Sequence, residues 1–406
     1  MPGKTESYSQ TTSRTTVETQ TKTEQLVFAK TDEVKLANWL KRILPQVEQE
    51  LLEGLTPNQQ PDKIGDSTEN FDINIKHCQQ IAFLGDQNSH GHALWLSLYA
   101  SDVPVLALTS SGSHENWCRH LNQWIKVFIP KREAGKDTLI FTEAKQISLN
   151  ACIQTLSRNP FNKDVFAGGT ISGDIFIWKF KNDYKSVDVE EIGSHSVTEA
   201  PNALDWLDET HLIGCLDNSQ VVIWKVSKEI IQESLFSVQK KDKAKLTVIV
   251  ALTRTQFVVG TDKGDVIHCI LTPSQDSVET VVLKKHKFAV THISKVTVQG
   301  NLAVYSCDLN GELFVHDLYK TDKDPELILN IPLPYKTTFC TSKDGETVFC
   351  PSEDGGLDIY RLKNGLLKTV NGNLQGKGNC IKRSDNGNWF VTGIYNGYFQ
   401  IFKLDE

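Results

Sequence analysis

The sequence predicts an all-β fold, a seven-bladed β-propeller, from an internal repeat, the strand pattern within each repeat and a composition suited to a large core. The 406 residues are enough for one propeller and an N-terminal extension. Hydrophobic residues make up 39% of the chain and charged residues 23%, a balance typical of globular proteins. The domain count therefore depends on the repeats.

The repeat pairs a turn residue with a bulky residue five positions later. The six pairs are Gly173 and Trp178, Ser219 and Trp224, Gly264 and Cys269, Gly311 and His316, Gly355 and Tyr360, and Gly397 and Phe402. Their second members are 42 to 47 residues apart, which is the length of one four-stranded blade. The residues within each pair, such as 174–177, form an apolar run that predicts a strand after a tight turn.

Each of these strands follows another apolar run, at 165–169, 211–215, 257–260, 302–306, 347–350 and 389–393. Small residues in these runs let backbones approach closely. A seventh, less regular unit comes earlier, with apolar segments at 94–98, 103–108 and 124–128. Seven units close a ring and leave few open sheet edges. An open stack of sheets or two β-sandwiches does not explain the shared period, so we predict one propeller over 75–406.

Two different segments precede the propeller. Residues 1–31 contain nine threonines and three serines, and we expect this arm to be disordered because it has too little apolar surface to bury. Residues 32–60 predict an amphipathic helix interrupted near Pro45. Its apolar stripe contains Leu36, Leu40, Ile43, Leu44 and Val47. The stripe either binds a partner or covers the chain's own propeller, and the sequence favours neither.

Charge and cysteine usage narrow the functional classes. The net charge of −7 and the short basic runs, of which 240–243 is the densest, argue against nucleic-acid binding. The polar N-terminus and the shortness of all apolar runs predict no signal peptide and no membrane insertion. Nine cysteines without a Cys-x-x-Cys pair lie mostly in apolar runs. They predict buried thiols in a reducing compartment such as the cytoplasm.

No catalytic motif is present in the sequence, and we expect no enzyme activity, cofactor or metal. Five residues raise a metal hypothesis: His90, His92, His114, Glu115 and His120. We interpret them as exposed residues in polar loops around the first blade. The glycine-rich segment 168–173 joins two strands, whereas a phosphate loop leads into a helix.

The arm contains the strongest binding signal. Thr19, Gln20 and Thr21 lie in a short segment without proline, which suits the addition of one strand to a partner's sheet edge. Ser9, Gln10 and Thr11 repeat the pattern more weakly, ten residues earlier.

This order of parts resembles the dynein intermediate chains, a WD-repeat family. The likeness is closest to those of cytoplasmic dynein-2, the motor of retrograde intraflagellar transport, and in particular to the shorter form. The segments that carry it are 114–117, 121–127, 165–169 and 172–178. The chain departs from the WD pattern because Trp178 and Trp224 are both followed by lysine, and only His316 keeps an acidic neighbour, Asp317.

The resemblance implies roles and partners. Thr19, Gln20 and Thr21, with Ser9, Gln10 and Thr11 as a second site, match the segments that bind a dimeric LC8-type light chain. The helix at 32–60 lies where the family binds roadblock-type light chains, and the propeller would hold the dynein-2 heavy chain beside a second intermediate chain. The implied location is the cytoplasm, the cytoskeleton, and the cilium and its base.

The hypothesis is therefore a non-catalytic scaffold of the dynein-2 motor. Two alternatives stay open at this stage. One is an unrelated WD-repeat scaffold, such as a ubiquitin-ligase substrate receptor, in which the Thr-Gln-Thr triplet is accidental. The other is an intermediate chain of an axonemal dynein.

Overall fold

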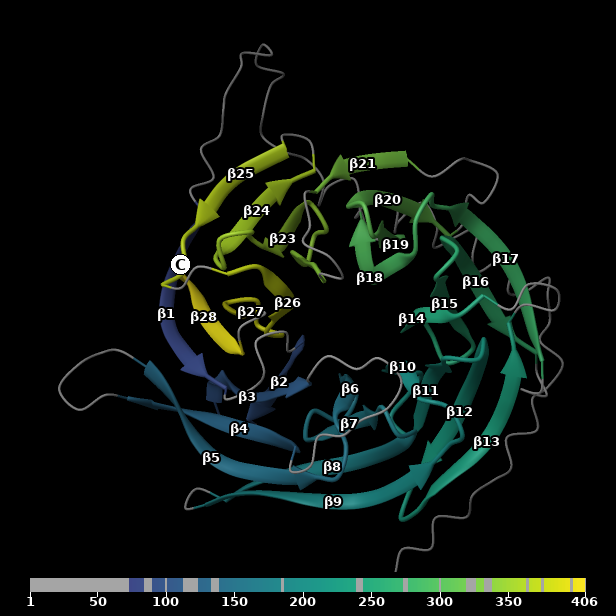
Figure 1. Ribbon diagram of the computed structural model, residues 1–406, viewed down its shortest axis with the longest axis horizontal. Helices are drawn as coiled ribbons and strands as arrows, with labels where there is room; N and C mark the ends of the chain where they lie inside the picture. The colour runs from purple at the N-terminus through teal and green to yellow at the C-terminus, as the bar shows by residue number, and fades with distance from the viewer. Residues whose placement is uncertain are drawn as a thin grey trace, which may run out of the picture. The chain divides into compact units, whose positions relative to one another are not determined.

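The computed structural model describes residues 73–83, 90–98, 101–111, 123–132, 139–183, 186–238, 244–272, 277–298, 301–318, 326–331, 338–362, 365–373, 376–394 and 397–405. In these residues 28 strands form seven four-stranded antiparallel sheets, and the sheets stand in a ring (Figure 1). The fold is a seven-bladed β-propeller, which confirms the predicted fold class. The predicted arm and helix lie outside the described residues. No helix long and apolar enough to cross a membrane is found in the described part.

The blades follow the chain, and six of them run from the inner strand to the outer strand. The first three contain β2 (His90–Leu98), β3 (Ser101–Ser111), β4 (Gln123–Arg132) and β5 (Leu139–Leu149); β6 (Ile153–Arg158), β7 (Val165–Thr170), β8 (Asp174–Asp183) and β9 (Ser186–Ser196); and β10 (Pro201–Trp206), β11 (His211–Leu216), β12 (Gln220–Val226) and β13 (Ile230–Ser237).

The next three contain β14 (Leu246–Ala251), β15 (Gln256–Thr261), β16 (Asp265–Leu271) and β17 (Val278–Lys285); β18 (Val290–Val298), β19 (Asn301–Asp308), β20 (Glu312–Asp317) and β21 (Glu326–Asn330); and β22 (Cys340–Thr341), β23 (Thr347–Pro351), β24 (Leu357–Arg361) and β25 (Gly365–Val370). The seventh combines β26 (Gly378–Arg383), β27 (Trp389–Ile394) and β28 (Tyr398–Asp405) with β1 (Asn74–Ala82).

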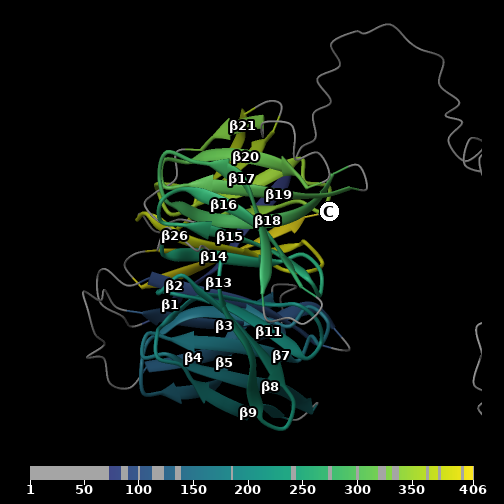
Figure 2. The same cartoon turned by 90° about the vertical axis from the view of Figure 1, so that its right-hand side faces the viewer.

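The inner strands surround a central channel. Each contacts the inner strand of the next blade, from β2 through β6, β10, β14, β18 and β22 to β26, and β26 contacts β2 again. Figure 2 shows the ring from the side, with β21 at the top of the picture and β9 at the bottom. Inner-strand residues that are far apart in sequence therefore meet around one channel.

The repeated turn residues have a backbone conformation that explains their identity. Gly173, Gly264, Gly311, Gly355 and Gly397 have φ between 78° and 91°, and Ser219 has φ of 69°. These values lie in the left-handed region, where glycine has no Cβ to clash. Each residue ends the tight turn between the second and third strands of its blade. The repeat found in the sequence is thus the repeat of one backbone turn.

The same turn binds the outer edge of its blade. The carbonyl oxygen of Gly173 accepts a hydrogen bond from Val197 N at 2.9 Å, and that of Gly264 accepts one from His286 N at 2.8 Å. The equivalent bond in the next blade runs from Ile331 N to Gly311 O at 2.9 Å. Because each donor lies just beyond an outer strand, the turn fixes that strand's end.

The last blade closes the ring with the N-terminal strand. β1 pairs antiparallel with β28, from Asn74 opposite Asp405 to Ala82 opposite Tyr398. The backbone N–H of Phe83 then donates to Gly397 O at 2.8 Å, the bond that outer strands make in other blades. The sequence pattern did not single out β1, because its alternation of polar and apolar residues contains no turn pair.

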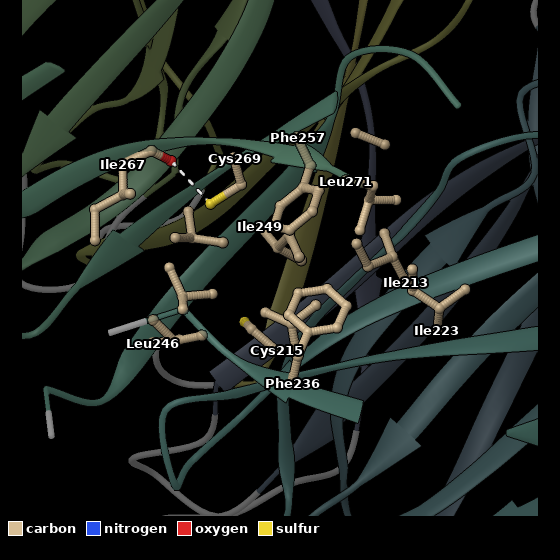
Figure 3. Close-up of a cluster of buried hydrophobic side chains, with 14 of the residues drawn as sticks. Ile213, Cys215, Ile223, Phe236, Leu246, Ile249, Phe257, Ile267, Cys269 and Leu271 are labelled. Atoms are coloured by element: carbon tan, nitrogen blue, oxygen red, sulfur yellow. Dashed lines mark hydrogen bonds between the residues drawn. The ribbon is translucent and has the colours of Figure 1, made fainter. Parts of the chain in front are cut away.

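Apolar side chains fill the space between neighbouring blades. The largest of these clusters joins the β10–β13 blade to the β14–β17 blade, and Figure 3 shows Phe236 and Phe257 within it. Their ring centroids are 6.2 Å apart, and Phe257 is fully buried. Cys215 and Cys269 lie in the same cluster. Burial of each large side chain contributes roughly 1.5–3 kcal/mol.

The described cysteines are free thiols, as the sequence analysis predicts. Desolvation raises the pKa of Cys215 to about 12 and that of Cys380 to about 11, so both stay protonated. Cys78 is the exposed cysteine among those described.

Candidate binding surfaces

The residues predicted to bind light chains lie outside the described part of the chain. These are Ser9, Gln10, Thr11, Thr19, Gln20 and Thr21 of the arm, and Leu36, Leu40, Ile43, Leu44 and Val47 of the helix. The structure places none of them, and their roles stay predictions.

Two of the histidines in the metal hypothesis lie elsewhere than expected. His90 and His92 belong to the inner strand β2, whereas the sequence analysis placed them in polar loops. Their pairing partners on β3 are Ser111 and Thr109. The expectation was wrong because Gly91, between them, indicates a loop, yet it packs within the sheet, where a Cβ would come 2.8 Å from the Phe399 ring. His114, Glu115 and His120 lie outside the described residues.

The glycine pair of the segment 168–173 serves packing. Gly168 and Gly169 lie on β7, and both are buried. A Cβ on Gly168 would come 2.7 Å from the Trp178 ring, and one on Gly169 would come 2.4 Å from Pro201. The glycines therefore let β7 lie against its neighbours, and no helix follows them to bind a phosphate.

A buried polar chain links the β14–β17 and β18–β21 blades. His286 Nε2 lies 2.8 Å from Ser306 Oγ, which lies 2.7 Å from His316 Nε2. On the other side, His286 Nδ1 lies 3.5 Å from Asp308 Oδ2, and both side chains are fully buried. Desolvation lowers the pKa of His316 to about 3, so its ring is neutral at physiological pH. This arrangement connects one outer strand to the next blade.

The same region is the metal candidate that the described residues offer. His286, Asp308 and Glu312 each offer one possible ligand atom, and these three atoms lie within 4.8 Å of one another. However, Asp308 Oδ1 accepts hydrogen bonds from the backbone N–H groups of Asn310 and Glu312, both at 3.0 Å. Thr170 and Thr261 use their hydroxyls in the same way in other blades, at 3.0 and 2.9 Å. We therefore assign this cluster to the repeated turn.

A cavity of about 680 Å³ opens where the inner strands β14, β18, β22 and β26 end. Its walls are partly apolar, with Val250, Ile293, Phe339 and Ile381 among the lining residues. Hydroxyl groups from Ser342 and neighbouring residues also line it. The cavity thus lies at one mouth of the central channel and draws on four successive blades.

Positive charge dominates the lining. Lys295, Lys343, Lys382 and Arg383 contribute four cations, against the single carboxylate of Asp385. Asp385 already forms an ion pair with Arg158, whose Nη1 lies 2.5 Å from its Oδ2. The chain as a whole has a net charge of −7, so the cavity lining has the opposite sign of charge to the whole protein.

Two of the lysines differ from the arginine in how they are held. Arg383 is fixed by hydrogen bonds from Nη1 to Thr341 O and from Nε to Gly387 O, both at 3.0 Å. Among the described residues, the acceptor for Lys295 Nζ is the carbonyl oxygen of Ala251, at 3.0 Å. No ion pair to Lys295 or Lys382 is found in the described residues. The two ammonium groups therefore keep hydrogen-bonding capacity for a ligand.

Neighbouring groups add to this electrostatic picture. Asp205, at the end of β10, accepts backbone hydrogen bonds from Ala251 N at 2.8 Å and Trp206 N at 2.9 Å. Desolvation raises the pKa of Asp205, while Lys295 and Lys382 lower it. Desolvation, followed by the charge of Lys382, lowers the pKa of His292 to about 3. The ring of His292, which lines the cavity, is therefore neutral, and the lysines supply the positive charge.

Comparisons with known proteins assign no family. No protein-family model matches the chain, and no curated protein matches its sequence. The fold and the geometry of these surfaces are therefore the basis for any functional conclusion.

The sequence analysis missed the charged cavity. It considered basic residues only as contiguous runs, and Lys295, Lys343 and Lys382 are separated by more than 35 residues each. Their spacing of 48 and 39 residues approximates the blade repeat, which brings them to one channel mouth. The signal available was the pair Lys295 and Arg383, which occupy equivalent positions on the inner strands of two blades, opposite Val304 and Phe390.

Proposed function

We propose that this chain is a non-catalytic intermediate chain of the cytoplasmic dynein-2 motor. The observation that carries the proposal is a seven-bladed ring that follows an arm containing the Thr19-Gln20-Thr21 segment. The fold directly supports the more general part of this proposal, that the propeller is a WD-repeat scaffold. The motor assignment rests on the resemblance in the segments 121–127, 165–169 and 172–178.

The strands of the first two blades are consistent with that resemblance. Trp124 to Val127 lie on β4, where Ile125 and Val127 are fully buried. Trp178 lies on β8 and packs on Phe166, with ring centroids 5.2 Å apart. The similar segments are thus core strands of the propeller, which supports a shared architecture without identifying a partner.

The mechanism is assembly by multivalent docking. A dimeric light chain that binds the arms of two intermediate chains would hold the two propellers together. Each later contact with the heavy chain then occurs at a raised effective concentration. Roadblock-type light chains would bind the helix at 32–60, and the propeller would bind the heavy chain in the cytoplasm and at the ciliary base. No bond is made or broken in this scheme.

A pull-down from ciliated-cell extract tests the proposal. The full chain is compared with the double variant Gln10→Ala, Gln20→Ala, and a matched control carries Gln25→Ala and Gln46→Ala outside the two triplets. We expect the dynein-2 heavy chain with all three proteins and an LC8-type light chain with the wild type and the control only.

Four other outcomes would contradict parts of the proposal. Absence of every dynein heavy chain would refute the motor assignment and leave a WD-repeat scaffold, and recovery of ubiquitin-ligase subunits would identify a substrate receptor. Recovery of an axonemal heavy chain would assign the chain to the motor of ciliary beating. Equal light-chain recovery by all three proteins would exclude the two triplets as the binding segments.

A further inference from the structure

The cavity at the channel mouth has the features of a peptide site. We propose that it binds an acidic peptide segment of a partner protein, with a carboxylate between Lys295 and Lys382 and a neighbouring apolar side chain against the apolar wall. This inference does not depend on the motor assignment, because it rests on the described propeller alone.

Charge is the first argument. The two lysines come from different blades, β18 and β26, and both line the same cavity. Lys295 is exposed, whereas Lys382 is half-buried. An ion pair at Lys382 is therefore screened less than one on an open surface. A carboxylate placed there also gains hydrogen bonds, because each ammonium has donors to spare.

The apolar wall is the second argument, and it favours a peptide over a small polyanion. Val250 and Leu252 line the side formed by β14, Leu302 of β19 also lines the cavity, and all three side chains are half-buried, so part of their apolar surface is open to a ligand. Ile293, Phe339 and Ile381 pack almost fully buried behind this surface. A phosphate cluster gains nothing from these groups, whereas a Leu, Ile or Phe beside a carboxylate buries apolar area against them.

The fixed groups around the lysines are the third argument. Arg383 is held by backbone carbonyls and by the Phe349 and Phe390 rings, whose centroids lie 5.6 and 5.7 Å from its Cζ. Asp385 is paired with Arg158. The walls of the cavity are therefore already organised, and a ligand needs to order only the two lysines.

Selection from a displayed random peptide library on the full chain tests the proposal. The enriched peptide is then labelled with fluorescein and its binding is measured by fluorescence anisotropy, together with a counterpart in which Asp and Glu become Asn and Gln. We expect enriched sequences with acidic residues next to apolar ones, and binding that is lost in the amide counterpart.

Variants locate the binding site. The double variant Lys295→Gln, Lys382→Gln should weaken binding about tenfold, because it removes one exposed ion pair and one half-buried ion pair. The control Lys181→Gln, Lys225→Gln removes the same charge from outer positions, where these lysines pair with Glu190 and Glu233, and should bind like the wild type. Lys295→Arg, Lys382→Arg should restore much of the affinity, and equal melting temperatures would show that the variants fold.

Several results would overturn the proposal. These are failure to enrich any acidic peptide, and equal weakening by the cavity variant and the control variant. Two other classes of anion are tested by adding inositol hexakisphosphate or a single-stranded oligonucleotide and measuring whether either displaces the labelled peptide. Binding of either probe at the two lysines, without any peptide that competes, would assign the cavity to that class of ligand instead.

Discussion

The turn at Gly311 provides a sharp test of how the blades are held together. Replacement by alanine places a Cβ 1.8 Å from the carbonyl oxygen of Ile331 while φ is +84°. The left-handed conformation costs about 1–2 kcal/mol for an alanine, and displacement of the backbone adds about 1–3 kcal/mol. Reduced freedom of the unfolded chain offsets about 0.4–1 kcal/mol. We expect Gly311→Ala to lower the free energy of unfolding by roughly 2–4 kcal/mol.

Gly365 is the matched control. Its φ is +77°, but a Cβ there would meet nothing within 4 Å. Gly365→Ala therefore carries the conformational strain without the clash, and the expected loss is about 1 kcal/mol. The two substitutions are identical in chemistry and differ only in what surrounds the new methyl group.

Thermal unfolding followed by circular dichroism measures the difference. In a propeller of this size, 1 kcal/mol corresponds to about 1–2 °C in melting temperature, so Gly311→Ala should melt about 1–6 °C below Gly365→Ala. Equal melting temperatures for the two variants would refute the argument that the turn carbonyl and the end of the outer strand are in tight contact.

Three further predictions follow from the buried groups. Trp224→Ala should lower the free energy of unfolding by about 3–5 kcal/mol, because the fully buried ring leaves a cavity, and urea titration measures the loss. Cys78 should react with Ellman's reagent at once, whereas Cys215, with its raised pKa, should react only after unfolding; fast reaction of Cys215 in the native protein would contradict its burial. The lowered pKa of His316 favours protonation in the unfolded state, so stability should fall as the pH drops from 6.5 toward about 3. His316→Phe should flatten this profile, and an unchanged profile would exclude His316 as a source.

The fold was predictable because one backbone turn recurs. Gly264 and Gly311 stand at the same point of successive blades, and the turn requires a residue that tolerates positive φ. Ser219 takes this conformation without being glycine, and its buried hydroxyl donates to Ala244 O. A pattern of side chains thus revealed a pattern of backbone geometry.

Ring closure was less accessible to the same reasoning. β1 forms the outer strand of the last blade through pairing with β28, and its residues carry no turn signal of their own. An outer strand alternates between buried and exposed residues, as Ile75 and Lys76 do, and such a pattern fits many surfaces. The partner of a strand is a property of the whole topology rather than of its local sequence.

The charged cavity was hidden for a related reason. Lys295, Lys343 and Lys382 each look like ordinary surface lysines in their local sequence. Only the ring places them at one channel mouth, and only packing shows that Arg383 is occupied by backbone carbonyls. The placement of His90 and His92 in polar loops was wrong because a glycine between two histidines suggests a loop, although the inner strand needs Gly91 to pass Phe399.

The pairing of β1 with β28 also constrains how the molecule is made. The ribosome synthesises β1 long before β28, because the strands of six blades lie between them in the sequence. During that interval the hydrogen-bonding groups of β1 have no strand to join, and its contacts belong to the longest-range class in the domain. Ring closure is therefore expected to be a late step of folding. A circular permutant that joins β1 directly after β28 would convert this slow long-range contact into a local hairpin.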